Sequence, residues 1–448
     1  MSKAMAERLE AAGLDADTAR TKATLFASAT ETLARHTGGN HGAPAAIFVP
    51  GRIEVVGKHV DYAAGRSLVC AVNRGFCLAV RPREDATVRM LRADGGGESA
   101  FPLSLEVPAL PGDWSNYPRT VARRIARNFH EARRGADIAF ASDLPPASGL
   151  SSSSALVVAT FLALMRVNDL SNNPTYRKEL STLENLAGYL GAVENGLGYG
   201  ALAGDHGVGT FGGSEDHAAI LASQPDRLSQ FAYCPARLER RVPLPAGYTF
   251  AIGFCGAHAE KTGNALEKYN RASRLTTEAI EIWRRETGRN DAYLARAVAS
   301  APNAVEEIRA VLGRVSRPDV LQRFEHFYAE NEEIVPQAGG ALERGDVSAF
   351  GSVVDRSQQL TEEWLGNQVP QTIHLARAAR RLGAAAASAF GAGFGGSVWA
   401  LVQANDADAF LKQWSADYAS AFPSEARRAI WFTTPAGPPA FAVNPSDH

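Results

Sequence analysis

The alternation of apolar and polar positions predicts a chain of mixed strands and helices. Short apolar runs at 46–49, 69–81 and 248–254 are typical of buried strands, and glycine, proline or polar turns bound them. Segments with apolar residues at helical spacing alternate with these runs, and they dominate the C-terminal half from Thr262 to Gly383. The pattern predicts an α+β fold with two lobes.

Finer features of the same pattern predict where the lobes divide. Pro50-Gly51 is expected to end the first strand, and the polar segment 235–241 is expected to separate the lobes. The predicted division is a helical extension over 1–45, a first lobe over 46–235 and a second lobe over 236–448. Other expected strands lie at 87–91, 137–141, 228–234 and 429–433, and other expected helices at 1–38, 116–135, 151–167 and 406–421.

The composition and net charge argue against nucleic acid or a membrane as a binding partner. Hydrophobic residues make up 45% of the 448 residues and charged residues 21%, so a substantial core can form. The net charge of −2 provides no basic field for nucleic acid or an anionic membrane, and no uninterrupted apolar stretch approaches the ~18 residues of a membrane span. Four cysteines without CxxC spacing are expected to be reduced thiols of a cytoplasmic protein.

The segment from Leu144 to Ala155 predicts a phosphate site. A proline-bearing turn and Gly149 precede four consecutive serines and a helix-forming run. A helix N-terminus leaves backbone N–H groups unpaired and carries about half a positive charge, so phosphate binds there readily. The segment is not a Walker loop, since it has no GxxxxGK[ST] pattern. The other interpretation is an ordinary N-capped helix, for which one serine suffices.

Two further segments favour phosphate, because together the three follow the order of motifs in one known family. Pro50–Tyr62 reads PGRIEVVGKHVDY and resembles the galactokinase signature PGRVNLIGEHTDY. Pro145–Leu156 resembles the second motif of GHMP kinases, PxGxGLSSSAAL, and Gly391–Ser397 resembles the third, GAGFGG. From about Ala46 onward the chain therefore resembles a GHMP kinase, and within that superfamily a galactokinase.

This resemblance implies a fold and a nucleotide site. The implied fold is the two-lobed GHMP kinase fold, with a first lobe like ribosomal protein S5 domain 2 that binds ATP and a ferredoxin-like second lobe. ATP and sugar would meet between the lobes. The implied ATP-binding residues are Gly149, Leu150, Ser151, Ser152, Ser153, Ser154, Gly393 and Gly395.

The catalytic residues follow from the chemistry of phosphoryl transfer and from the resemblance. The reaction needs a group that accepts or orients the hydroxyl proton, and cationic charge near the moving phosphoryl group. Arg52 takes the place of the family's arginine. Galactokinases carry the base in a GxMDQxxxL segment, and 213–221 (GSEDHAAIL) matches it with Asp216 as the base. Asp205 is the alternative, because it lies closer to Glu194-Asn195, which resembles the family's AEN.

The same resemblance implies a metal and sugar contacts. Glu194 would bind Mg²⁺ together with Ser152 or Ser153, since carboxylate and hydroxyl oxygens suit this hard cation. Asp61 matches the aspartate that accepts hydrogen bonds from ring hydroxyls, and His59 lies in the same loop. Tyr269 resembles the family's tyrosine near the sugar, although a half-buried helix tyrosine is an equally good interpretation.

Lys58 is the main departure from the signature. Galactokinases have glutamate at this position, and it faces the C6 hydroxyl of the sugar. Lysine only donates hydrogen bonds and favours a negative partner, so one hypothesis is a substrate with a carboxylate at C6, such as galacturonate. The other is that Lys58 pairs with Glu54, which itself replaces the family's asparagine.

The predicted protein is an ATP-dependent sugar 1-kinase that uses Mg²⁺. It would phosphorylate the anomeric hydroxyl of galactose or a C6-carboxylate relative, as a cytoplasmic monomer or homodimer. One alternative is another GHMP kinase acting on mevalonate, homoserine or a heptose phosphate, which the galactokinase signature disfavours. A second alternative is a sugar and ATP sensor without chemistry, which the retained Arg52 and Asp216 disfavour.

Overall fold

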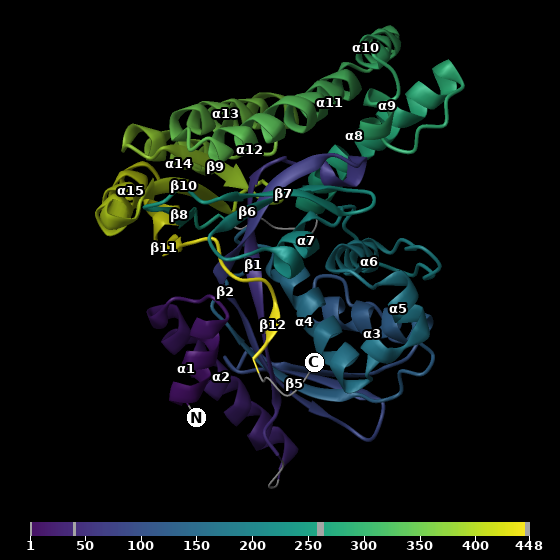
Figure 1. The fold of residues 1–448 in the computed structure, drawn as a ribbon, viewed down its shortest axis with the longest axis vertical. Helices are drawn as coiled ribbons and strands as arrows, with labels where there is room; N and C mark the ends of the chain where they lie inside the picture. The colour runs from purple at the N-terminus through teal and green to yellow at the C-terminus, as the bar shows by residue number, and fades with distance from the viewer. Residues whose placement is uncertain (1, 39–41, 258–263, 444–448) are drawn as a thin grey trace.

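Two sheets organise residues 2–38, 42–257 and 264–443, the part of the chain that the computed structural model describes (Figure 1). Within these ranges the first sheet has eight strands in the order β12-β1-β2-β5-β3-β4, with β6 joining β2 and β7 joining β6. The second has four strands in the order β11-β8-β10-β9. Every pairing is antiparallel except that of β3 with β5. The strands are β1 (Ala45–Val56), β2 (Arg66–Pro82), β3 (Thr87–Arg92), β4 (Glu98–Pro102), β5 (Ala136–Ser142), β6 (Arg227–Ala232), β7 (Arg237–Pro243), β8 (Tyr248–Phe254), β9 (Ala386–Phe390), β10 (Ser397–Gln403), β11 (Ile430–Thr434) and β12 (Phe441–Ala442).

Helices cover both sheets. In the first lobe α2 packs on β2 and β5 and α4 packs on β1 and β2, whereas α13, α14 and α15 cover the second sheet. No helix in the described ranges is both long and apolar enough to cross a membrane. The helices are α1 (Ser2–Ala11), α2 (Ala16–Thr37), α3 (Asn116–Asn128), α4 (Ser152–Val167), α5 (Pro174–Glu179), α6 (Leu183–Asn195), α7 (Glu215–Ala222), α8 (Asn264–Thr287), α9 (Leu294–Val298), α10 (Ala304–Arg314), α11 (Pro318–Tyr328), α12 (Val335–Glu343), α13 (Val347–Leu360), α14 (Pro370–Arg381), α15 (Ala407–Ala421) and α16 (Pro423–Ala426), with a 3₁₀ turn η1 (Asp61–Ala63) and a π-helical segment η3 (Ala329–Ile334).

Pro50 and Gly51 do not end the first strand, contrary to the sequence prediction. β1 continues through them to Val56, with a shift of register against β2 between Pro50 and Arg52. A side chain at position 51 would collide with the Leu150 carbonyl oxygen, 2.6 Å from an added Cβ, so only glycine fits. A bulge of this kind bends a strand and redirects its side chains. Here it brings Arg52 against the turn before α4, where its backbone N–H donates to the Leu150 carbonyl at 3.2 Å.

One other expectation is wrong, the predicted lobe boundary falls on a strand, and one expectation falls outside the described residues. The helix predicted over 116–135 ends at Asn128, because Phe129 turns to an extended conformation and buries its ring in the core. The polar segment predicted as a boundary at 235–241 is largely strand β7, which pairs with β6 in the first sheet. The predicted helix start at Thr262 lies outside the described residues.

The C-terminal end of the chain returns to the first lobe (Figure 1, yellow). The Gly437 N–H donates to the Ala71 carbonyl, and the Ala440 N–H donates to the Ile220 carbonyl. Strand β12 then pairs with β1, with Phe441 opposite Phe48. The first sheet is therefore completed by residues that follow the whole second lobe in sequence.

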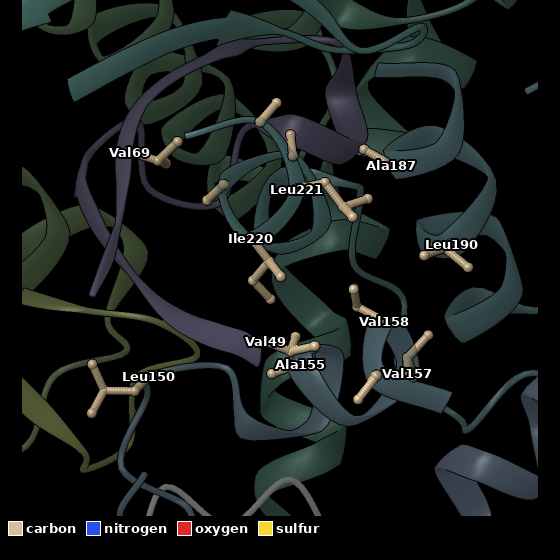
Figure 2. Close-up of a cluster of buried hydrophobic side chains, with 14 of the residues drawn as sticks. Val49, Val69, Leu150, Ala155, Val157, Val158, Ala187, Leu190, Ile220 and Leu221 are labelled. Atoms are coloured by element: carbon tan, nitrogen blue, oxygen red, sulfur yellow. The ribbon is translucent and has the colours of Figure 1, made fainter. Parts of the chain in front are cut away.

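The first-lobe core includes apolar side chains of the same elements that carry the sequence motifs, β1, α4 and α7. Figure 2 shows apolar side chains from β1, α4, α6 and α7 gathered in one cluster, among them Val49, Val158, Leu190 and Ile220. All four of these side chains are buried. The start of α4 and the start of α7 are thus held in place by the packing of their own apolar faces.

Truncation of Ile220 tests this packing. We expect Ile220→Ala to lower the free energy of unfolding by roughly 2–5 kcal/mol, because it leaves a cavity where the side chain has no exposed surface. Leu197→Ala is the control, since Leu197 is 63% exposed, and its effect should stay within about 0.5 kcal/mol. Denaturant unfolding of both variants measures the difference, and equal losses would contradict the assignment of this core.

Candidate active site

Arg52 and Asp216 form a partly buried ion pair where β1 and α7 meet. Arg52 is 4% exposed, and its Nε donates to Asp216 Oδ1 at 2.6 Å. Its Nη1 donates to the carbonyl of Gly149 in the loop before α4. Burial alone lowers the pKa of Arg52, but the Asp216, Glu215 and Glu54 carboxylates together more than offset this and raise it above its ordinary value. The site therefore contains a fixed positive charge in contact with the predicted base.

The Ser154 hydroxyl connects Asp216 to Glu194. Its Oγ lies 2.9 Å from Glu194 Oε2 and 3.1 Å from Asp216 Oδ2, and the side chain is buried. His217 Nε2 lies 3.2 Å from the same Glu194 oxygen. The N-terminal turns of α4 and α7 and the last turn of α6 thus converge on one polar cluster.

Asp205, the alternative base, lies in a different environment. Its Oδ2 accepts hydrogen bonds from Arg123 Nε and Arg127 Nε, both at 3.2 Å. Burial raises the pKa of Asp205, but the N–H of His206 and the two arginines outweigh burial and hold it below its ordinary value. This geometry is that of a structural ion-pair cluster, and Asp205 is absent from the lining of the cavity that contains Asp216.

A small cavity of about 50 Å³ opens beside Asp216. His59 and Tyr269 line one part of it, with their ring centroids 5.5 Å apart and an angle of 61° between the ring planes. Gly391 and Ala392 bring the second lobe to the same cavity. Its charged lining consists of Arg52, Glu54, Asp61, Glu194, Glu215 and Asp216.

Asp61 is held at this cavity by backbone groups. Its Oδ2 accepts the N–H of Glu215 at 3.1 Å, and its Oδ1 accepts the N–H of Tyr62 at 3.0 Å. Burial raises the pKa of Asp61, and the nearby Asp216 charge adds to that rise. Asp61 and Asp216 are therefore brought together, as the sequence predicts for a sugar-binding carboxylate beside a base.

Lys58 is absent from the cavity lining. The side chain is 2% exposed, and its Nζ donates to the carbonyl of Ala389 in the second lobe. Its charge lowers the pKa of both Glu54 and Glu330, opposing the rise that burial causes in each. The Lys58 ammonium therefore bonds to Ala389 and acts on Glu54 and Glu330 through its charge.

A larger cavity of about 530 Å³ adjoins the serine run. Gly149 and Ser151–Ser153 form one end of it, and aromatic side chains including Trp114 and Tyr117 form another part. No side chain caps the N-terminus of α4, and Ser151 is in the left-handed conformation with φ 59°. The serines therefore do not act as an ordinary N-cap of α4, and the helix N-terminus is available to an anion.

The glycine loop of the third motif contacts the phosphate loop through its first residues. Gly391 has φ 80°, and an added Cβ would lie 2.7 Å from the Gly149 carbonyl oxygen. Ala392 lines both cavities. Gly393, one of the predicted ATP contacts, packs instead against Asn367, and neither it nor Gly395 lines the larger cavity.

Several lining residues were not found from the sequence. Trp114 and Tyr117 carry no motif signal, because aromatic residues at a helix start are equally typical of a core. Glu215 could have been noticed, since it directly precedes Asp216 and adds a second carboxyl group where the family motif has methionine. Glu54, which the sequence suggested only as a partner for Lys58, also lines the small cavity.

Comparison with known families agrees with this geometry. The galactokinase galactose-binding signature matches residues 34–82. The GHMP kinases N terminal domain matches 116–201, and the GHMP kinases C terminal domain matches 340–420.

Individual proteins extend the likeness to most of the chain. A galactokinase of Chloroflexus aggregans is 31% identical over 83% of this chain and 87% of its own length. One of Roseiflexus sp. is 29% identical, over 81% and 85% respectively. The crystal structure of Lactococcus lactis galactokinase complexed with galactose matches at a TM-score of 0.78 and 24% identity, covering 93% of this chain and 99% of that one.

Two lobes that face each other across a phosphate loop and a glycine loop define a GHMP kinase, and the predicted fold class is confirmed. The galactokinases that match over most of both chains identify the family within this superfamily. The chain belongs to the galactokinase family, and it is an ATP-dependent sugar kinase.

The environment of Glu215 predicts how stability depends on pH. Burial raises the pKa of Glu215 well above its ordinary value of 4.5, and the Glu54 and Asp61 carboxylates add to that rise. The folded state thus binds this proton more tightly than the unfolded state does. The stabilisation from Glu215 is complete below pH 4.5 and is lost as the pH rises toward the raised pKa, by up to about 1.4 kcal/mol per pH unit.

Glu215→Gln carries no charge at any pH, so its stability should fall less between mildly acidic and mildly alkaline buffer than that of the wild type. Denaturant unfolding across that range measures both slopes. Glu281→Gln, at an exposed position of α8, should keep the wild-type slope. Parallel curves for Glu215→Gln and the wild type would contradict the predicted titration.

Proposed function

We propose that the chain transfers the terminal phosphoryl group of ATP to the anomeric hydroxyl of galactose or a neutral sugar of closely similar shape. The observation that carries this proposal is the position of Asp216. It lines the small cavity and contacts Arg52, and Arg52 lines both that cavity and the larger one beside the serine run. A sugar in the first and a nucleotide in the second would meet at this ion pair.

In the proposed reaction the Asp216 carboxylate orients the anomeric hydroxyl and accepts its proton. The sugar oxygen then forms a bond to the terminal phosphorus of ATP as the bond from that phosphorus to the departing ADP oxygen breaks. Arg52 stabilises the negative charge that develops on the transferring group. The backbone N–H groups at Ser152 and Ser153 would hold the phosphates at the start of α4.

The proposed nucleotide complex includes Mg²⁺, which neutralises phosphate charge during transfer. Glu194 and Ser153 offer the oxygen atoms that this cation prefers. Tyr117 lines the larger cavity together with Ser153. Burial raises the pKa of Tyr117 to about 12, and the Glu194 charge adds to that rise. In the described ranges no cluster of three His, Cys, Asp or Glu side chains could hold a metal, so the nucleotide phosphates would complete the ligand set.

A neutral sugar is favoured over a uronic acid by the charges around the small cavity. Its lining is rich in carboxyl groups, and its cation Arg52 is already paired with Asp216. The Lys58 ammonium, which would have to meet a C6 carboxylate, donates to Ala389 and lies outside the lining. Among the described residues an added carboxylate would therefore be desolvated without an unpaired lysine or arginine beside it, which is strongly unfavourable.

Replacement of the two competing aspartates tests the assigned base. We expect Asp216→Asn to lower kcat by roughly 10²–10⁴-fold, because the amide cannot accept the proton, while ATP still binds. Asp205→Asn should retain turnover and lose stability, since Arg123 and Arg127 would lose their counter-charge. Coupled ADP release measures turnover, and nucleotide titration measures binding. The reverse pattern would transfer the role to Asp205.

Side-by-side kinetics on galactose and galacturonate test the substrate class. We expect kcat/KM to favour galactose by about a hundredfold or more, because Arg52, the cation that the described residues contribute to this cavity, is already paired with Asp216. Preference for galacturonate would overturn the neutral-sugar proposal. In that case Lys58→Met should remove the preference, since no other lysine lies in the signature loop.

A further inference from the structure

Lys58 lies in a buried charged cluster between the lobes. An ammonium group enclosed at 2% exposure needs hydrogen-bond acceptors and negative charge around it. The Ala389 carbonyl accepts from it, and Glu54 and Glu330 provide the charge, with 3% and 0% exposure respectively.

The two carboxylates beside Lys58 accept backbone N–H groups across the lobe interface in opposite directions. Glu54, on β1 of the first lobe, accepts the N–H of Gly391 in the second lobe at 2.8 Å. Glu330, in η3 of the second lobe, accepts the N–H of Gly57 in the first lobe at 2.8 Å. The donation from Lys58 to Ala389, in strand β9 two residues before Gly391, is a third link between the two lobes.

The positive charge of Lys58 strengthens these two cross-lobe hydrogen bonds. Burial raises the pKa of both Glu54 and Glu330, and the Lys58 charge is the leading influence that opposes the rise at each carboxyl group. Charged carboxylates accept N–H bonds about twice as strongly as neutral groups. Loss of the ammonium would therefore weaken both cross-lobe bonds together.

The linked segments are those that serve the two cavities. Residues 57–62, the sugar loop, carry His59 and Asp61 into the small cavity. Residues 391–397, the glycine loop, carry Ala392 into both cavities. The rest of the sugar loop is fastened separately, because the buried Arg323 of α11 donates to the His59 carbonyl and to the Tyr62 hydroxyl.

We propose that Lys58 is a positioning residue that fastens the sugar loop to the glycine loop, so that occupation of the sugar cavity and of the phosphate cavity is energetically coupled. The coupling rests on the proposed function of the two cavities, whereas the fastening itself does not. Both Glu54 and Lys58 differ from the galactokinase signature, which has asparagine and glutamate at these positions. The pair thus changes the lobe contact while leaving Arg52 and Asp61 in place.

Amide hydrogen exchange of the ligand-free protein tests the fastening. In Lys58→Met the amides of Gly57 and Gly391 should exchange about tenfold faster or more, because both lose a charged acceptor. Amides at 60–65 should change little, since Arg323 still holds that side of the loop. The matched control is Lys22→Met, which removes a lysine of 1% exposure paired with Asp143 inside the first lobe. It should leave Gly57 and Gly391 unchanged.

Unchanged exchange in Lys58→Met, or equal acceleration in Lys22→Met, would overturn the proposal. Glu54→Gln provides a second variant in case Lys58→Met does not fold. It should accelerate Gly391 and leave Gly57 protected through Glu330, and acceleration of neither amide would also overturn the proposal.

The coupling is tested by galactose affinity with and without a non-hydrolysable ATP analogue. In the wild type the analogue should tighten galactose binding roughly fivefold or more, and in Lys58→Met the factor should fall toward one. An unchanged factor in Lys58→Met would reject the coupling while the proposed function stands. A wild type that binds neither galactose nor a neutral sugar of closely similar shape would reject the proposed function, and the exchange result would still decide the fastening.

Discussion

The active site depends on a contact between two glycines of opposite lobes. Gly149 and Gly391 both have positive φ, at 82° and 80°, and their backbones approach more closely than any side chain would permit. Around this contact the Gly149 carbonyl accepts from Arg52 while the Gly391 N–H donates to Glu54. The phosphate loop, the Arg52–Asp216 ion pair and the second lobe are thus placed relative to one another by contacts to main-chain atoms, which cannot change rotamer.

The charges of the site fall into two groups with different neighbours. Arg52 neutralises Asp216 at the end nearest the serine run. Lys58 offsets Glu54 and Glu330 at the lobe interface. Between these cations lie carboxyl groups whose pKa values burial raises, notably Glu215. Such groups can exist neutral and donate hydrogen bonds as well as accept them, which suits a cavity for hydroxyl-rich ligands.

The sequence was sufficient where local pattern decides the structure and insufficient where a distant partner does. β8 has the bounds that its apolar run predicts, and α4 begins within one residue of the expected start, because turn residues bound both. The bulge at Gly51 could not be predicted, since it depends on Leu150 and the opposing strand. The direction of Lys58 depends on the Ala389 carbonyl of the second lobe, which no local pattern connects to it.

The competition between Asp216 and Asp205 illustrates the same limit. Both aspartates precede a histidine, and motif spacing alone left them as rivals. What separates them is a pair of arginines on α3 that hold Asp205 away from the site. Fold class and the phosphate loop were predictable because glycine and serine carry strong backbone preferences, whereas side-chain pairing across elements leaves no such signature.

The return of the C-terminal end to β1 has a consequence for biosynthesis. β12 and the residues before it bond to Ala71 and Ile220 of the first lobe, yet the ribosome makes them after the entire second lobe. While the chain is being made, the β1 edge of the first sheet has no partner strand there, and an unpaired edge invites pairing with other chains. The enzyme's first-made lobe is therefore the last to be finished, and its exposure to misassembly lasts as long as translation does.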